Sequence, residues 1–348
     1  MKTKVLICLL SIFCMLGAKQ PQITAVPQGP WMTGPLLTPG ATVLPFPHIN
    51  IETYANVVVN TGQYKDNWDV LKNTNKFFAN SVQTNLQFGL TSWLDIEVSP
   101  QVYYNYSNHA ASWAFGDLPV TVDVQIYNPP SSSHFPAIKL ILKESFPTGK
   151  YRKLNPNKNG TEVGGSGSYT TSLGLALGKV IHFREDHYLS LRLAGSYNFP
   201  APVRLIGFNA YGGSATTNMN FVPSQSAQFG LGIEYTLSQN WVFAIDFAGN
   251  WARRSNYSAS PGTGFITEPQ TFTPIPGSGG TAIGFLTETP AVLVQQQVLG
   301  PSLQYSMAPA IEYNWSEHLG IIAGSWFTFA GKNAVQFYSG VVAFNYYH

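Results

Sequence analysis

Residues 80–106 read NSVQTNLQFGLTSWLDIEVSPQVYYNY and decide the fold. Apolar and polar side chains alternate up to Phe88, a short break follows at residues 89–93, and the alternation resumes at Leu94. A period of two predicts β-strands, because successive side chains point to opposite faces of a sheet. Each predicted strand has about ten residues, enough to cross a hydrocarbon layer roughly 30 Å thick at a tilt. The stretch therefore predicts a hairpin with one apolar and one polar face.

The composition of the whole chain decides between a soluble sandwich and a membrane barrel. Charged residues make up only 10% of the chain, against about 25% in soluble domains, whereas aromatic residues reach 14%. No apolar run approaches the roughly twenty residues that a membrane helix needs. Few charges, many aromatic residues and no helical span are typical of an outer-membrane β-barrel.

Residues 1–18 have the pattern of a secretory signal peptide. Lys2 and Lys4 precede an apolar core over residues 5–17, and Ala18 offers a small residue for cleavage. We therefore expect export across the inner membrane of a Gram-negative bacterium, cleavage of this peptide and insertion into the outer membrane.

Both cysteines, Cys8 and Cys14, lie within this peptide, so the exported chain has no disulfide, no thiol nucleophile and no cysteine metal site. Without the two leading lysines, 17 basic residues balance 17 acidic ones. A neutral chain gives no argument for a nucleic-acid partner. The sequence predicts no metal site and no cofactor.

The remaining chain divides into residues 19–47 and residues 48–348. The first segment is rich in Pro and Gly and has no periodicity; it is either a periplasmic lead-in or a plug inside the barrel. The second contains twelve alternating stretches that we interpret as strands. Their ranges are 48–59, 80–88, 94–106, 118–127, 136–146, 169–181, 188–199, 227–237, 241–251, 302–315, 319–330 and 334–347.

The predicted connections alternate between short and long. The short ones are residues 90–93, 128–135, 181–187, 238–240 and 316–318; the long ones are 60–79, 107–117, 147–168, 200–226 and 252–300, with 331–333 as a short exception. Outer-membrane barrels alternate in this way, with short periplasmic turns and long extracellular loops. The sequence therefore predicts a transmembrane, antiparallel, up-and-down β-barrel of about twelve strands, with its polar face toward the lumen and its apolar face toward lipid.

Several charged residues fall on the face assigned to the lumen. They are Glu52, Asp95, Glu97, Asp123, Lys139, Lys143, Arg192, Glu234, Asp246 and Glu312. One interpretation is a constriction that selects solutes by charge; the other is internal ion pairing, for example between Asp123 and Lys139. Twelve strands close at roughly 24 Å across the backbone, a width narrow enough for both. Acids near short turns predict a mostly acidic periplasmic mouth.

A second charged group lies in the segments assigned to the extracellular side. Its members are Lys150, Arg152, Lys153, Lys158, Arg253 and Arg254. Lipopolysaccharide phosphates or the steering of anionic solutes would explain such a basic patch, and a merely solvated loop would explain it equally well.

Evidence for an enzyme is weak. A barrel hydrolase needs a histidine on a strand, oriented by a third group next to a nucleophile. His109 with Asp117 is the best pair that the sequence offers, and it falls in a predicted loop. We therefore expect no catalytic site.

Five segments carry a resemblance to a known family. They are FPTGKY at 146–151, GSGSYTTSLGLA at 165–176, FGLTSWLDIEV at 88–98, GLGIEYTLSQNWVF at 230–243 and GPSLQYSMAPAIEYNWSEHLGI at 300–321. Together they resemble the bacterial outer-membrane family named for the meta-pathway of phenol degradation, over roughly residues 45–348. The resemblance implies an outer-membrane channel or transporter for small solutes, hydrophobic or aromatic compounds among them, and it assigns no functional residues.

We expect passive diffusion of small solutes through the lumen, with a structural or surface-interaction barrel of occluded lumen as the alternative. The expected partners are outer-membrane lipid, lipopolysaccharide, a small-molecule solute and the barrel assembly machinery. That machinery usually reads a terminal Phe or Trp, whereas this chain ends in Tyr347 and His348, which keep the alternation.

Overall fold

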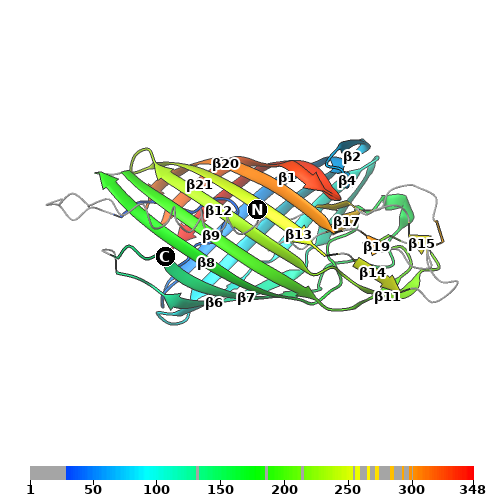
Figure 1. Ribbon diagram of the computed structural model, residues 1–348, viewed down its shortest axis with the longest axis horizontal. Helices are drawn as coiled ribbons and strands as arrows, with labels where there is room; N and C mark the ends of the chain where they lie inside the picture. Colours follow the sequence, from blue (N-terminus) through cyan, green and yellow to red (C-terminus); the bar gives the residue numbers. More distant parts are fainter. Residues whose placement is uncertain are drawn as a thin grey trace.

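The computed structural model describes residues 29–130, 133–184, 187–212, 215–253 and 301–348, and the backbone of six short strand segments between 255 and 299. The predicted signal peptide lies outside the described residues. Figure 1 shows one long barrel of oblique strands, with the short strands of the loops gathered at one end. Among the described residues, no helix is long and apolar enough to span a bilayer.

Twelve barrel strands, two of them each divided into two pieces, and a set of shorter loop strands make up the fold. The barrel elements are β1 (Ile49–Tyr64), β2 (Val70–Gly89), β3 (Leu94–Val98) with β4 (Gln101–Ser107), β5 (Ala110–Phe115) with β6 (Leu118–Tyr127), β7 (Ala137–Phe146), β8 (Thr170–Arg184), β9 (His187–Pro200), β12 (Ser226–Thr236), β13 (Trp241–Ala252), β20 (Ser302–Ser316), β21 (Leu319–Lys332) and β22 (Ala334–Tyr347). The loops contain a 3-10 turn, η1 (Pro156–Lys158), and the strands β10 (Val203–Ile206), β11 (Asn218–Val222), β14 (Ser255–Ser258), β15 (Phe265–Ile266), β16 (Thr271–Thr273), β17 (Ile283–Phe285), β18 (Val292–Leu293) and β19 (Val298–Leu299).

The barrel closes between its first and last strands. Each strand pairs antiparallel with its neighbours in chain order, and β1 pairs with both β2 and β22, for example Glu52 with Asn345. No edge remains between first and last strand, which satisfies the backbone groups that a bilayer cannot hydrogen-bond. The predicted closed barrel of about twelve antiparallel strands is confirmed.

The two faces of the strands have the polarity expected in lipid. Large apolar side chains of the outer face are solvent-exposed in the isolated molecule, among them Leu173, Leu175, Phe243 and Val342. Small and polar side chains between them, such as Ala244, point inward and are buried. The leucine and valine rows therefore face outward and do not pack against each other as they would in a sandwich.

Two of the predicted long loops are instead tight hairpins between extended strands. Residues 60–79, predicted as a loop, belong mostly to β1 and β2, which are joined at residues 65–69. Residues 107–117, also predicted as a loop, form a turn at Asn108 and His109 followed by β5. Both turn residues have positive φ (45° and 63°), as in the two-residue hairpins that match strand twist. Residues 60–64 and 70–76 show no alternation, because a strand beyond the lipid needs hydrogen bonds but no apolar face.

The wall is interrupted at one place in two adjacent strands. β3 and β4 are separated at Ser99 and Pro100, and β5 and β6 at Gly116 and Asp117. Backbone bonds bridge the break, since the amide of Ser99 donates to Pro119 (3.0 Å) and that of Gly116 to Gln101 (2.8 Å). We call the two openings of the barrel the short-turn end and the long-loop end.

Candidate functional site in the barrel lumen

Residues 29–47, the N-terminal segment, lie against the inner wall in the half of the barrel near the short turns. The segment is held through its backbone. Asp246 on β13 accepts hydrogen bonds from the backbone N–H of Leu37 (3.1 Å) and Thr38 (3.0 Å), and Glu312 on β20 accepts one from Thr33 (3.0 Å). Both carboxylates are fully buried. Charge-assisted bonds of this kind are stronger than neutral ones.

The same mode of attachment continues along the segment to the opposite wall. Asp95 accepts from the backbone N–H of Leu44 (2.6 Å), and Gln125 accepts from that of Val43 (2.8 Å). On the first wall, the Nδ2 of Asn314 donates to the carbonyl oxygen of Trp31 (2.9 Å). The segment therefore crosses the lumen between distant strands.

Glycines on the inner face of the wall make room for the segment. A Cβ at Gly230 would lie 2.8 Å from Thr38 Oγ1, one at Gly232 would lie 2.7 Å from Pro35 Cγ, and one at Gly178 would lie 2.8 Å from the Cβ of Ala41. The alternating glycines of β8 and β12 thus provide a shallow channel in which the segment lies.

The segment separates two cavities. The larger, about 380 Å³, lies toward the long-loop end and is bounded by residues 33–40 and 42 of the segment. The smaller, about 330 Å³, is bounded by residues 32, 33 and 42–45 and by wall residues beside the short turns. Both cavities touch Thr33, Thr42, Asn50 and Gln87. A thin layer of protein therefore separates the two cavities.

The charged residues that the sequence assigned to the lumen fall into three groups. Asp95, Asp246 and Glu312 hold the N-terminal segment. Four others form ion pairs, Lys139 Nζ with Asp123 Oδ2 (2.5 Å) and Arg192 Nη2 with Glu234 Oε2 (2.9 Å). The remaining three, Glu52, Glu97 and Lys143, line the larger cavity. Within the described ranges, no three side chains of His, Cys, Asp or Glu are grouped to hold a metal ion.

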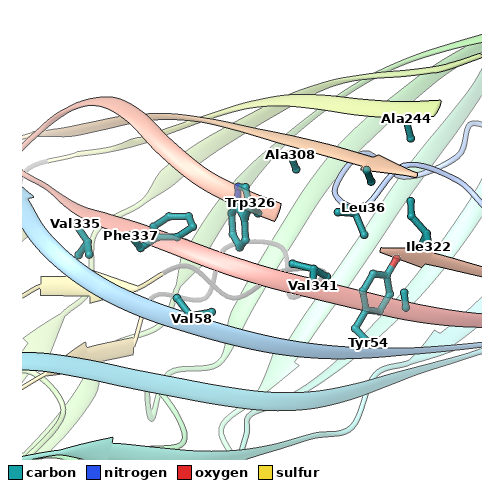
Figure 2. Packing of buried hydrophobic residues seen from close by; sticks show 12 residues of the cluster. Leu36, Tyr54, Val58, Ala244, Ala308, Ile322, Trp326, Val335, Phe337 and Val341 are labelled. Carbon is teal, nitrogen blue, oxygen red and sulfur yellow. The ribbon is translucent and has the colours of Figure 1, made fainter. Parts of the chain in front are cut away.

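The wall formed by β1, β20, β21 and β22 carries a cluster of apolar side chains among the polar ones of its inner face, and this cluster was not predicted from the sequence. Figure 2 shows side chains of these strands directed toward the same interior space as Leu36 of the N-terminal segment. Trp326 and Tyr54 also border the larger cavity. The strand β22 is apolar on both faces, so alternation could not reveal an inner apolar wall. The buried members of the cluster are Leu36, Tyr54, Val58, Ala244, Ala308, Ala310, Ile322, Trp326, Val335, Phe337, Val341 and Ala343.

Two loops cover the long-loop end and form what we call the cap, residues 149–168, 201–212 and 215–222. Its described apolar side chains, including Leu154, Leu205 and Phe221, pack in one buried cluster with Phe77 and Tyr103 of the inner wall. The long-loop end is thus covered by a small folded unit whose apolar core is shared with the inner wall of the barrel.

The predicted basic patch is partly neutralised within the cap. Glu162 lies 2.8 Å from Lys150 Nζ and 3.8 Å from Lys158 Nζ. Arg152 lies over the ring of Tyr151 at 5.3 Å, Lys153 is exposed in a left-handed conformation, and Arg253 donates to Gln225 (3.2 Å). Arg254 lies outside the described residues.

Acidification should loosen this part of the cap. Burial alone would raise the pKa of Glu162, but the backbone N–H of Asn155 and the two lysines outweigh it and lower the pKa below its usual value. A carboxyl with a lowered folded pKa stabilises the fold above its unfolded pKa, about 4.3, and loses that effect as pH falls through the folded value. We expect hydrogen-exchange protection of residues 150–162 to fall below about pH 4. Glu162→Gln should lack protection already at pH 7 and show no further loss on acidification.

The candidate catalytic pair is not assembled. His109 is exposed at the tip of the β4–β5 hairpin, and Asp117 is buried at the far end of β5. Strand geometry places them roughly 20 Å or more apart. A general base must lie within hydrogen-bond reach of its partner, so these two residues cannot act together.

Comparison of the fold finds outer-membrane barrels. The chain is similar to the COG4313 outer membrane channel from Pseudomonas putida F1, with a TM-score of 0.60 and 13% identity over 89% of this chain and 99% of that chain. It also aligns with the NanC porin at a TM-score of 0.41 and 8% identity, over 85% of this chain and 98% of that one. No family model matches the sequence, and no curated protein matches it. The fold is that of an outer-membrane β-barrel.

Proposed function

We propose that the protein is an outer-membrane channel that passes small solutes when its N-terminal segment moves in the lumen. The observation that carries the proposal is the pair of cavities on the two sides of this segment, which share Thr33, Thr42, Asn50 and Gln87. Displacement of one short, uncharged segment would join them. In the closed state the segment is held by hydrogen bonds to three wall carboxylates, those of Asp95, Asp246 and Glu312.

The solute class follows from the two unlike walls of the larger cavity. One wall presents Trp326 and Tyr54, and the other presents Glu97, Lys143 and Arg192. Such a cavity suits small compounds with an apolar or aromatic body and a polar group, since a few placed polar groups orient a ligand held by apolar surface. The resemblance to the family of the meta-pathway of phenol degradation supports the same class.

The short turns would face the periplasm and the cap the outside, as in other barrels of this type. The exposed apolar face would then contact outer-membrane lipid. Among the described residues of the basic patch, Arg152, Lys153 and Arg253 form no ion pair with an acid, and they would meet lipopolysaccharide phosphates. The barrel assembly machinery would insert the chain.

Conductance in planar bilayers tests the proposal. The purified full-length protein should give steady, small ion-carrying steps, because each opening joins two narrow cavities. A trace that stays closed at every voltage would contradict the proposal and favour a structural barrel with an occluded lumen.

Replacement of Trp326 should weaken solute binding in the lumen. Trp326 is 3% exposed and borders the larger cavity, so Trp326→Ala removes an aromatic surface worth about 1 kcal/mol beyond its area. We expect a small phenol to block the ionic current with an apparent Kd about tenfold higher in this variant. Trp241→Ala, on the exposed outer face, is the matched control and should leave the block unchanged.

A further inference from the structure

The Pro-Thr-Gly and Gly-Ser-Gly-Ser segments of the loop at 147–168 close around one buried carboxylate, that of Asp117. Asp117 is 1% exposed and lies in the break between β5 and β6. The backbone N–H of Gly149 donates to its Oδ1 (3.0 Å), and the N–H and Oγ of Ser166 donate to its Oδ2 (2.7 and 2.9 Å). Donors from the two ends of the loop therefore converge on one side chain.

The glycines of these segments are required by close packing around this carboxylate. A Cβ at Gly165 would lie 2.1 Å from Asp117 Oδ1, and one at Gly149 would lie 2.6 Å from the carbonyl carbon of Gly164. A Cβ at Gly164 itself would lie 2.0 Å from the carbonyl oxygen of Phe115. The two segments thus form a closely fitted receptor for Asp117.

Asp117 belongs to the fixed wall. The Nε2 of Gln101 donates to the carbonyl oxygen of Asp117 (3.0 Å), and the Tyr103 hydroxyl donates to Gln101 Oε1 (2.7 Å). These contacts tie Asp117 to β4, so the loop is the part that can leave.

Hydrogen bonds connect the two loops of the cap beside this attachment. The Tyr211 hydroxyl donates to the carbonyl oxygen of Ser166 (2.8 Å), and the Ser168 hydroxyl donates to that of Ala201 (2.8 Å). Tyr211 is also part of the buried apolar cluster of the cap. Detachment of residues 149–168 from Asp117 would therefore loosen residues 201–212 as well.

We propose that Asp117 is a latch that holds the cap closed over the outer opening, and that solutes enter after the loop detaches from its carboxylate. The gating part rests on the proposed channel function. The latch itself is a statement about which contact holds the cap, and it can be measured without transport.

Hydrogen exchange in the folded, full-length protein tests the latch. Asp117→Asn keeps the shape but removes the charge and one acceptor oxygen, so residues 149–168 should exchange at least about tenfold faster, with β20–β22 unchanged. Ser166→Ala, which keeps the carboxylate, should have a smaller effect and serves if Asp117→Asn fails to fold. Glu144→Gln, on β7 and in contact with Thr171, is the control. If residues 149–168 exchange at the wild-type rate in both Asp117→Asn and Ser166→Ala, the proposal is wrong.

Conductance and a crosslink test the gating role. Asp117→Asn should raise the open probability several-fold. A disulfide between Ser112→Cys and Thr161→Cys, whose hydroxyls lie 3.0 Å apart, should return it to the wild-type level in the same background. A freed loop with unchanged conductance overturns the gating role. If neither wild type nor Asp117→Asn conducts ions, while the loop of Asp117→Asn exchanges faster, the proposed channel function is wrong. The role of Asp117 in holding the cap would still be supported.

Discussion

Oxidation of a Thr38→Cys/Gly230→Cys variant is expected to lower the open probability by at least an order of magnitude, and reduction is expected to restore it. A Cβ built at Gly230 lies 3.7 Å from the Cβ of Thr38, close to the roughly 3.8 Å found in disulfides. The bond would fix the N-terminal segment to β12 in its closed position. Cysteines are otherwise absent after Cys14, so no native thiol competes in a protein prepared without residues 1–18.

The comparison is between the oxidised and reduced states of the same protein in planar bilayers. Gly230→Cys alone is the control, since it cannot form the intramolecular bond and should respond to neither reagent. Equal conductance in both states would mean that ions pass beside a stationary segment, and the proposed role of the segment would be wrong.

Replacement of Lys139 by Met should destabilise the barrel by about 3–5 kcal/mol, because it leaves the Asp123 carboxylate buried without its partner. The two side chains form an ion pair of 2.5 Å and are 5% and 8% exposed. Urea unfolding in lipid vesicles, followed by tryptophan fluorescence, measures the change in the free energy of unfolding.

The double variant Asp123→Leu/Lys139→Met provides the matched control. Replacing a buried ion pair by apolar groups of similar volume is often neutral, so the double variant should be more stable than Lys139→Met alone. If both variants lose the same free energy of unfolding, water in the adjacent cavity solvates the charge of Asp123 and the expected penalty is absent.

Much of the barrel could be predicted from the sequence because lipid forces alternation. Residues 118–127 and 334–347 were predicted as strands with the same ends as β6 and β22. The signal fails at β5, which is only six residues long, and at the start of β2, which extends without an apolar face. It also fails to separate pieces of one strand, because the break at Ser99 and Pro100 preserves the alternation on both sides.

The candidate site could be predicted only in part. Alternation predicted that Asp246 and Glu312 lie on the inner face, but it did not predict which groups they bind. Asp246 binds Thr38, 208 residues away in the chain, and such a contact depends on barrel closure. The apolar cluster of the inner wall could not be predicted from alternation, because Val341 and Val342 lie on opposite faces of β22 and are both apolar. The role of Asp117 was hidden in a segment predicted as an irregular loop.

The way in which the wall holds the N-terminal segment has a consequence for variation of this protein. The carboxylates of Asp246, Glu312 and Asp95 accept hydrogen bonds from backbone N–H groups of the segment, which nearly every amino acid supplies. Side chains such as Leu37 could therefore be replaced to change the shape of the lumen while these hydrogen bonds are kept. Proline is the exception, since it lacks the amide hydrogen; at Leu37 or Thr38 it would remove one of the two hydrogen bonds that attach the middle of the segment to Asp246.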